Sequence, residues 1–140
     1  MRLILLAMLF VSVHAGAQAL NTERAHSNYM VNCQGCHLAD GSGLPGSVPS
    51  MKEFVGNFLM VPGGREFLIQ VPGSANSPLD DAALAELLNW ILLSMSSEQL
   101  PAEFMPYTAR EVAAVRYKKL LDVASVRASL VAGFPASPHL

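Results

Sequence analysis

The spacing of hydrophobic residues along the chain predicts a fold made mainly of helices. Ala25, Tyr29 and Cys33 recur at intervals of four residues, which places them on one face of a helix. Asn21 and Thr22 precede them and are residue types that favour the start of a helix. We therefore expect a first helix that runs to Cys33, with Tyr29 packed against another helix of the core.

The most regular helical pattern lies in the middle of the chain, from Ser77 to about Ser94. Ser77 is expected to cap this helix, Pro78 suits its first position, and Asp80 stands where a capping-box carboxylate belongs. The hydrophobic residues of its expected buried face are Leu84, Leu87, Leu88 and Ile91.

Two shorter helices are expected between these elements, at residues 52–59 and 65–71. Their inward hydrophobic residues are Phe54, Val55, Phe58 and Leu59 in the first helix, and Phe67 and Leu68 in the second. Pro62-Gly63-Gly64 and Pro72-Gly73 follow these helices and favour turns. The sequence contains no strand–helix–strand pattern.

Beyond Ser96 the sequence predicts a helical extension. Pro101 and Pro106 indicate an extended connector, and the segment from Thr108 to Glu111 is a capping box that opens a helix. The hydrophobic residues at helical spacing in the extension are Val112, Val115 and Tyr117, followed by Val123, Val126 and Leu130.

The first nineteen residues have the organisation of a secretory signal peptide. Arg2 precedes an apolar run from Leu3 to Val13, with Ala17-Gln18-Ala19 as the favoured cleavage site and Ala15-Gly16-Ala17 as the second choice. An uncleaved anchor is the alternative, but the run is shorter than the roughly 20 residues that span a bilayer, and no later stretch is long enough. The expected parts are a cleavable signal peptide (1–19), a domain (20–96) and the C-terminal helical extension (97–140).

Length and charge narrow the class of protein. A chain of 140 residues allows one domain beside the leader and the extension, and its formal net charge is −2, with no basic patch that would indicate nucleic-acid binding. Residues 20–96 hold three basic and seven acidic residues. Five of the nine basic residues lie in the extension, and they are Arg110, Arg116, Lys118, Lys119 and Arg127. The extension is either a solvated strap across the core or a surface that docks a partner.

Five residues, Cys33-Gln34-Gly35-Cys36-His37, carry the candidate chemistry. Two thiols separated by two residues and followed by a histidine form the attachment signature of c-type haem. In that chemistry Cys33 and Cys36 each add to a vinyl group, and His37 becomes an axial ligand of the iron. A structural disulfide, a redox dithiol and half of a zinc site are the alternatives, but zinc would need further ligands and the chain has no second cysteine pair.

The motif and the segment after it resemble the class I cytochrome c family in its small bacterial monohaem form. The resemblance rests on Cys33–His37, on the loop rich in Gly and Pro that follows, and on Val48-Pro49-Ser50-Met51, and it covers about residues 22–94. It implies an all-α, cytochrome c-like domain around one covalent haem c. The middle helix would cross the first helix beside the haem, so that Trp90 or its neighbours contact Tyr29.

The resemblance also implies roles for the loop at residues 40–49. The loop should wrap the His37 side of the haem, and the carbonyl of Pro49, or else of Pro45, should accept the imidazole N–H. Met51 stands where the family commonly has an apolar residue packed on the haem, so it is expected to fill space.

The second axial ligand is the point where the sequence departs from the family. That ligand is usually a methionine in the loop before the last core helix, but residues 71–78 contain neither Met nor His. Met60, Met105 and Met95, in that order, are the candidates from elsewhere in the chain. A vacant or water-bound position is the remaining alternative.

These features predict a periplasmic electron-transfer protein rather than an enzyme. The resemblance implies a one-electron carrier that works with a redox partner protein, either a donor dehydrogenase or a terminal acceptor, and without a membrane span in the mature chain. No Ser/His/Asp arrangement, carboxylate pair or phosphate loop indicates a catalyst. The alternative is a five-coordinate haem protein that binds a small gas or peroxide, as a sensor or an enzyme, and it depends on the missing methionine.

Overall fold

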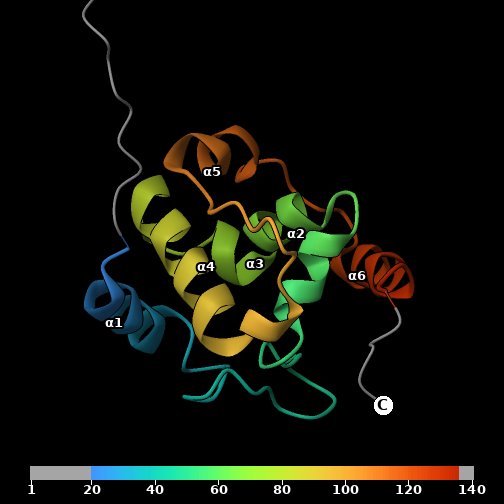
Figure 1. Ribbon diagram of the computed structural model, residues 1–140, viewed down its shortest axis with the longest axis horizontal. Coiled ribbons are helices and arrows are strands. Elements are labelled where there is room, and N and C mark those ends of the chain that lie inside the picture. Colours follow the sequence, from blue (N-terminus) through green and yellow to red (C-terminus); the bar gives the residue numbers. More distant parts are fainter. Residues whose placement is uncertain (1–19, 136–140) are drawn as a thin grey trace, which may run out of the picture.

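The computed structural model describes residues 20–135, and its regular elements are all helices (Figure 1), as predicted. They are α1 (Thr22–Asn32), η1 (Val55–Met60), α2 (Gly64–Gln70), α3 (Pro72–Ala75), α4 (Asp81–Met95), η2 (Ser97–Gln99), α5 (Ala109–Val115) and α6 (Val123–Ala132). The predicted signal peptide (1–19) and the tail at 136–140 lie outside the described residues. None of the described helices has the length and apolar character needed to cross a membrane.

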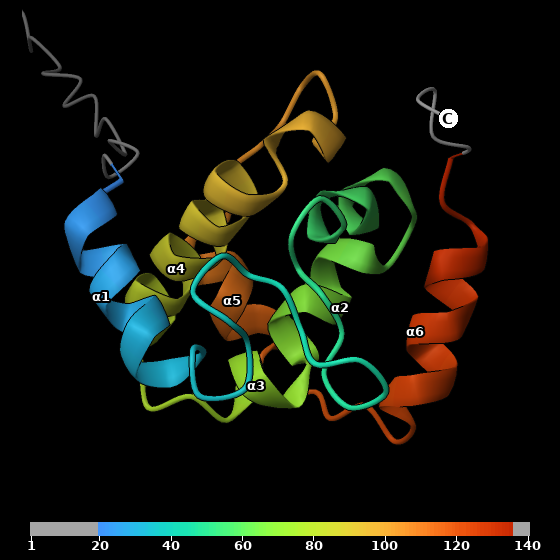
Figure 2. The same ribbon diagram turned by 90° about the horizontal axis from the view of Figure 1, so that it is seen from below.

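Helices α1 and α4 pack against each other at one end of the molecule (Figure 1, Figure 2). Ala25 and Tyr29 of α1 are fully buried, and the Tyr29 ring lies 5.4 Å from the ring of Trp90 on α4. The Asn21 side chain caps α1 by accepting a hydrogen bond from the N–H of Arg24 (2.9 Å). The predicted start of the first helix and the predicted contact between Tyr29 and Trp90 are therefore confirmed.

Helix α4 begins later than predicted. Asp80 is its N-cap, because its carboxylate accepts a hydrogen bond from the N–H of Ala83 (2.8 Å). The prediction that Ser77 caps this helix is wrong. Its hydroxyl donates to the carbonyl of Ser74 (3.0 Å), and its own carbonyl accepts from Arg116 (2.6 Å). The predicted buried face is confirmed, since Leu84, Leu87, Leu88 and Ile91 are all buried.

The short elements between α1 and α4 differ in detail from the prediction. The 3-10 helix η1 takes the place of the helix expected at 52–59. Helix α2 matches the helix expected at 65–71 and follows Gly63, whose φ of 84° lies in the left-handed region. Pro72-Gly73 begins the short helix α3 instead of a turn, because Pro72 fits the first position of a helix.

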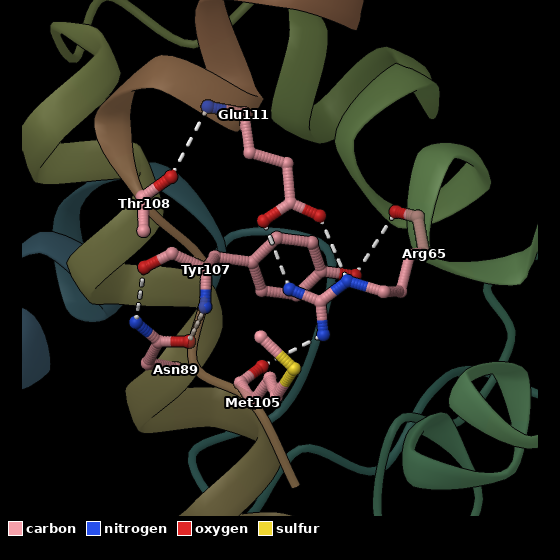
Figure 3. Close-up of polar contacts among 6 residues, drawn as sticks. All are labelled: Arg65, Asn89, Met105, Tyr107, Thr108 and Glu111. Carbon is pink, nitrogen blue, oxygen red and sulfur yellow. Dashed lines mark hydrogen bonds and ion pairs between the residues drawn. The ribbon is translucent and has the colours of Figure 1, made fainter.

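The C-terminal extension is packed onto the core through its connector (Figure 3). Tyr107 is buried, its N–H donates to the side-chain oxygen of Asn89 on α4 (2.7 Å), and the Asn89 amide donates to the Tyr107 carbonyl (3.0 Å). The guanidinium of Arg65 on α2 lies 4.2 Å from the centre of the Tyr107 ring and pairs with Glu111 of α5 (2.8 Å). The connector thereby joins α2, α4 and α5.

Helix α5 confirms its predicted cap and is shorter than the predicted helix. Thr108 accepts a hydrogen bond from the N–H of Glu111 (3.2 Å), as in a capping box, although the Glu111 carboxylate turns to Arg65. Tyr117 was expected to continue the hydrophobic spacing of this helix, but it lies beyond the end of α5 and is 75% exposed. The reason is that α5 ends at Val115, and the side chain of Arg116 takes the inward place.

Helix α6 lies at the opposite end of the molecule from α1 in both views (Figure 1, Figure 2). Asp122 caps it by accepting a hydrogen bond from the N–H of Ser125 (3.0 Å). The predicted hydrophobic face is confirmed, since Val123, Val126 and Leu130 pack against the core. The extension therefore spans the molecule from the connector at α4 to its far end.

Candidate functional site

The Cys33–His37 motif folds into a turn at the end of α1. Cys33 is the C-cap of this helix, and its N–H donates to the carbonyl of Tyr29 (2.9 Å). The N–H groups of Cys36 (3.1 Å) and His37 (2.9 Å) both donate to the carbonyl of Cys33. As a result, the side chains of Cys33, Cys36 and His37 line the same cavity.

This cavity has a volume of about 340 Å³ and is bounded mostly by apolar side chains. Most of the apolar residues come from η1, α2 and α4, and these are Val55, Phe58, Phe67, Leu68, Leu84, Leu87, Leu88 and Ile91. A concave apolar site with a few convergent polar groups is the usual form of a cofactor site, and its volume lies in the usual range of about 300–1,000 Å³.

The imidazole of His37 is partly buried and has an unused nitrogen. Burial lowers the pKa of His37, which favours the neutral ring that binds metals. Its Nδ1 atom is buried and has no hydrogen-bond partner among the described residues. The predicted hydrogen bond to the carbonyl of Pro49 or Pro45 is therefore not formed, although Pro49 lines the cavity. A buried ring nitrogen without a partner is unusual and indicates a group that binds here.

The Cys33 thiol does not have the character of the reactive thiol in a redox dithiol. Both cysteines are free in this structure, and burial, with the neighbouring Cys36, raises the pKa of Cys33 to about 11. A reactive dithiol needs a thiol whose pKa is lowered instead. The zinc alternative has no support either, because residues 20–135 contain no cluster of three His, Cys, Asp or Glu side chains that could hold a metal ion.

The loop after the motif is tied to the core at its start and closed by a hydrogen bond between its two ends. The Tyr29 hydroxyl donates to the carbonyl of Leu38 (2.5 Å), directly after His37. The N–H of Met51 donates to the carbonyl of Gly41 (2.8 Å). These bonds fix the backbone on both sides of the loop, and so they help to place His37 and Met51 in the cavity wall.

The three methionines predicted as second axial ligands lie outside the cavity. Met60 ends η1 and is 47% exposed, and Met105 in the connector is 73% exposed. Met95 is buried at the end of α4, but its side chain packs beside Gly41. None of these side chains is available to the cavity in this structure.

Met51 is the one methionine in the cavity wall within the described part of the chain, and His37 is the one histidine there. Met51 follows Pro49 in the loop and is packed against the core, which agrees with the space-filling role expected of it. The other described lining residues offer no Cys, Tyr, Met or His beyond the motif. Apart from the motif itself, Met51 is therefore the one described lining residue whose sulfur could serve as a further metal ligand.

Residues 71–77 form a further wall of the cavity, and one buried arginine of the extension holds their backbone. Arg116 is 3% exposed. Its guanidinium donates to the carbonyl oxygens of Ala75 (3.2 Å), Ser77 (2.6 Å) and Leu79 (2.7 Å), and it pairs with Asp81 (3.1 Å). The segment where the family usually has its methionine is thus fixed from outside by α5.

Two cavity residues were not identified from the sequence. Val123 and Arg127 of α6 line the same cavity as the motif. The hydrophobic spacing predicts that Val123 lies on a helix face, and Arg127 is one of the basic residues of the extension. No sequence pattern indicates that either residue lies near the two cysteines. Their spacing of four residues, which puts both on one helix face, is the signal that could have indicated a shared role.

The residues of the cavity fit a covalently bound haem. Both thiols and the imidazole meet at one side of an apolar cavity, and His37 has a buried nitrogen without a partner. The structure therefore brings the three predicted site residues together and leaves Met60, Met95 and Met105 elsewhere.

Comparison with known proteins points in the same direction. Two curated proteins match the chain, both named cytochrome c-552 and both from Thermus thermophilus. Each is 34% identical to the chain over 106 residues, a stretch that covers 63% of the chain and 81% and 72% of the two relatives. No family model matches the chain, and no solved structure matches it significantly.

Proposed function

Since the chain belongs to the class I c-type cytochromes, we propose that it is an exported one-electron carrier whose single haem c is held by Cys33, Cys36 and His37. It is an electron-transfer protein and not an enzyme. When bound, haem c supplies a reversible ferrous–ferric couple, and the polypeptide supplies attachment, orientation and the surrounding electrostatics.

The observation that carries the proposal is that both thiols and the imidazole line one apolar cavity. In the proposal, Cys33 and Cys36 form the thioether bonds and His37 binds the iron. The hydrogen bond from Tyr29 to Leu38 restrains the chain directly after His37 and so limits rotation of the ligand. The apolar walls would limit the access of water to an iron held by His37, and this low polarity would favour the ferrous state.

We further propose that the protein is periplasmic and exchanges electrons with a dehydrogenase or a terminal acceptor. Two observations support this. The first is the predicted signal peptide at residues 1–19, because c-type haem is attached after export. The second is a set of exposed cations in the extension, Arg110, Lys118 and Lys119, which would favour encounter with an acidic partner surface.

A spectroelectrochemical titration of the exported protein tests the carrier function. The chain is produced with its signal peptide in a host that matures c-type cytochromes, and the haem bands are followed as the potential is changed. We expect a reversible one-electron transition, and we expect the double variant C33A/C36A to lose covalent haem. Purified protein without haem, or with a couple that is not reversible, would contradict the proposal.

One observation favours a second function. Met60, Met95 and Met105 lie outside the cavity, so an iron held by His37 would have Met51 as its remaining methionine candidate, or would be left with a position for an external ligand. An iron with such a free position would bind a small diatomic molecule or a peroxide, in addition to carrying electrons.

Carbon monoxide added to the ferrous protein distinguishes these cases. Rapid binding by the wild type, at the same rate as by the variant Met51→Leu, would support the second function. No binding by the wild type, together with rapid binding by Met51→Leu, would show that Met51 ligates the iron and would exclude the second function. In the latter case the ferric wild type, but not the variant, should also show the far-red band that marks methionine–iron coordination.

A further inference from the structure

Arg127 of α6 carries a positive charge at the cavity and forms no ion pair with a carboxylate of residues 20–135. Among the described residues it is the one Asp, Glu, Lys or Arg side chain that lines the cavity. Its guanidinium carbon lies 5.2 Å from the centre of the Phe54 ring, which covers one face of the group. By contrast, the basic residues that form ion pairs within residues 20–135 are Arg24, Lys52, Arg65 and Arg116.

A haem c bound in this cavity would bring two carboxylates with it. The propionates leave the porphyrin at the edge opposite the two vinyl groups, and they are ionised at neutral pH. A carboxylate at an apolar site is costly unless a cation or hydrogen-bond donors face it. The cavity therefore needs a positive group at the edge that lies away from the two cysteines.

The fold provides such a group at the required side. Helix α1, which leads into Cys33, and helix α6 lie at opposite ends of the molecule in both views (Figure 1, Figure 2). The same cavity is lined by Asn32 and Cys33 on the α1 side and by Val123 and Arg127 from α6. A porphyrin attached at the two cysteines and enclosed by these walls would extend toward α6.

We infer that Arg127 binds a haem propionate, so that the C-terminal extension is part of the haem site. The inference rests on the proposed function, because it requires the haem to be attached at Cys33 and Cys36. A planar guanidinium can donate two parallel hydrogen bonds to one carboxylate, and the Phe54 ring restrains the plane of the group. The uncharged Asn and Ser side chains of the cavity wall cannot compensate the propionate charge.

A guanidinium paired with a propionate would also shift the reduction equilibrium of the haem. The ferric haem carries one more positive charge than the ferrous haem, so a nearby guanidinium favours the ferrous form. Removing Arg127 also leaves a propionate charge without compensation, which stabilises the ferric form. We expect a loss of about tenfold in the reduction equilibrium, which corresponds to a midpoint potential lower by about 59 mV for one electron.

Three variants of the full holoprotein test the inference: Arg127→Gln, Arg127→Lys and Lys119→Gln. Lys119 is a matched control because it is an exposed cation of the same extension and does not line the cavity. Midpoint potentials and resonance Raman spectra are measured for each protein. Arg127→Gln should lower the midpoint potential by the stated amount and shift the propionate bending band. Lys119→Gln should change the equilibrium by less than about twofold and leave the band in place.

The variant Arg127→Lys keeps the positive charge but removes the planar guanidinium, so it distinguishes the effect of the charge from that of the paired hydrogen bonds. It should keep most of the midpoint potential but shift the propionate band, because lysine is a point charge and cannot form the paired hydrogen bonds. If Arg127→Gln does not fold, this variant alone decides, and an unshifted band would overturn the inference.

Equal effects of Arg127→Gln and Lys119→Gln, with an unchanged propionate band, would also overturn it. The proposed function would remain intact in that case, since covalent haem and a one-electron couple would still be present. Wild-type protein without covalent haem would contradict the proposed function itself and remove the inference with it.

Discussion

At the scale of single residues, Gly43 is a position in the loop after the motif that has no room for a side chain. A Cβ atom there would collide with the backbone carbonyl of Val48, which accepts a hydrogen bond from the N–H of Leu44 (2.9 Å). Gly46 in the same loop has a left-handed φ of 77° but open space around it. The loop therefore offers a matched pair of glycines that differ in packing.

We expect Gly43→Ala to lower the free energy of unfolding by about 2–3 kcal/mol, because the backbone must move. Gly46→Ala should cost about 1 kcal/mol, from left-handed strain alone. Urea denaturation of both holoproteins measures the difference. Equal costs for the two variants would show that the close approach of Gly43 to Val48 does not constrain the loop.

The ion pair between Arg24 and Glu86 fastens α1 to α4, and its contribution should depend on pH. The Arg24 side chain donates to Glu86 (2.7 Å) and holds the pKa of that carboxyl below its usual value. A lowered pKa means that the ionised form is favoured in the folded state. The stabilisation is therefore present above the pKa of the unfolded chain and is lost as the pH falls through the folded pKa.

We expect Glu86→Gln to lower the free energy of unfolding by about 1 kcal/mol at pH 7, a small value because Arg24 is 60% exposed. The difference from the wild type should shrink as the pH falls below about 4.3, the usual glutamate pKa. Urea denaturation at pH 7 and pH 3.5 measures this, with Glu66→Gln on the exposed side of α2 as the control. A difference that stays constant with pH would contradict the assigned role of the carboxylate.

At the scale of elements, Arg116 links α5 to the segment before α4. Its guanidinium donates hydrogen bonds to the carbonyl oxygens of Ala75, Ser77 and Leu79. Without Arg116, these oxygens would lose the hydrogen bonds that it donates. We expect Arg116→Leu to lower the free energy of unfolding by about 3 kcal/mol, whereas Arg110→Leu on the exposed side of α5 should stay within about 0.5 kcal/mol. Thermal unfolding followed by circular dichroism measures both. A small effect of Arg116→Leu would mean that the 71–77 wall forms without the extension.

The same elements show what the sequence could and could not predict. Local signals were sufficient where one residue acts on its own helix, as with the caps at Asn21 and Thr108. They failed where a residue far along the chain forms a hydrogen bond with the backbone of the segment. Ser77 has the right type for a cap, but Arg116, 39 residues later, holds its carbonyl, and Asp80 caps instead. Hydrophobic spacing cannot reveal a buried arginine of this kind.

The sequence predicted the part of the candidate site that lies in one short segment, and it did not predict the part assembled from distant segments. The Cys33–His37 motif is contiguous, so its chemistry can be read from five neighbouring residues. The far side of the cavity is assembled from α2, α3, α4 and α6, and no local pattern joins these segments. For this reason the sequence suggested Met60 first as a second ligand, whereas the fold leaves it 47% exposed at the end of η1.

At the scale of the whole molecule, the extension completes the core and is more than a surface appendage. Tyr107, Val112 and Arg116 are buried within it, and all three precede α6. A chain that ends at Leu121 should therefore fold and keep covalent haem, with a Tm lower by about 10 °C from the lost contacts of α6. A chain that ends at Ser97 should not unfold cooperatively. Cooperative unfolding of the shorter chain would show that residues 20–96 are an independent domain.

The central claim is that this polypeptide carries one haem, bound through both cysteines of the motif. Peptide mapping by mass spectrometry of the exported, purified protein tests it most directly. The account predicts that the peptide containing residues 33–37 carries the mass of one haem, that no other peptide does, and that the haem resists extraction with acidified acetone. A motif peptide with free or disulfide-bonded cysteines would contradict the account.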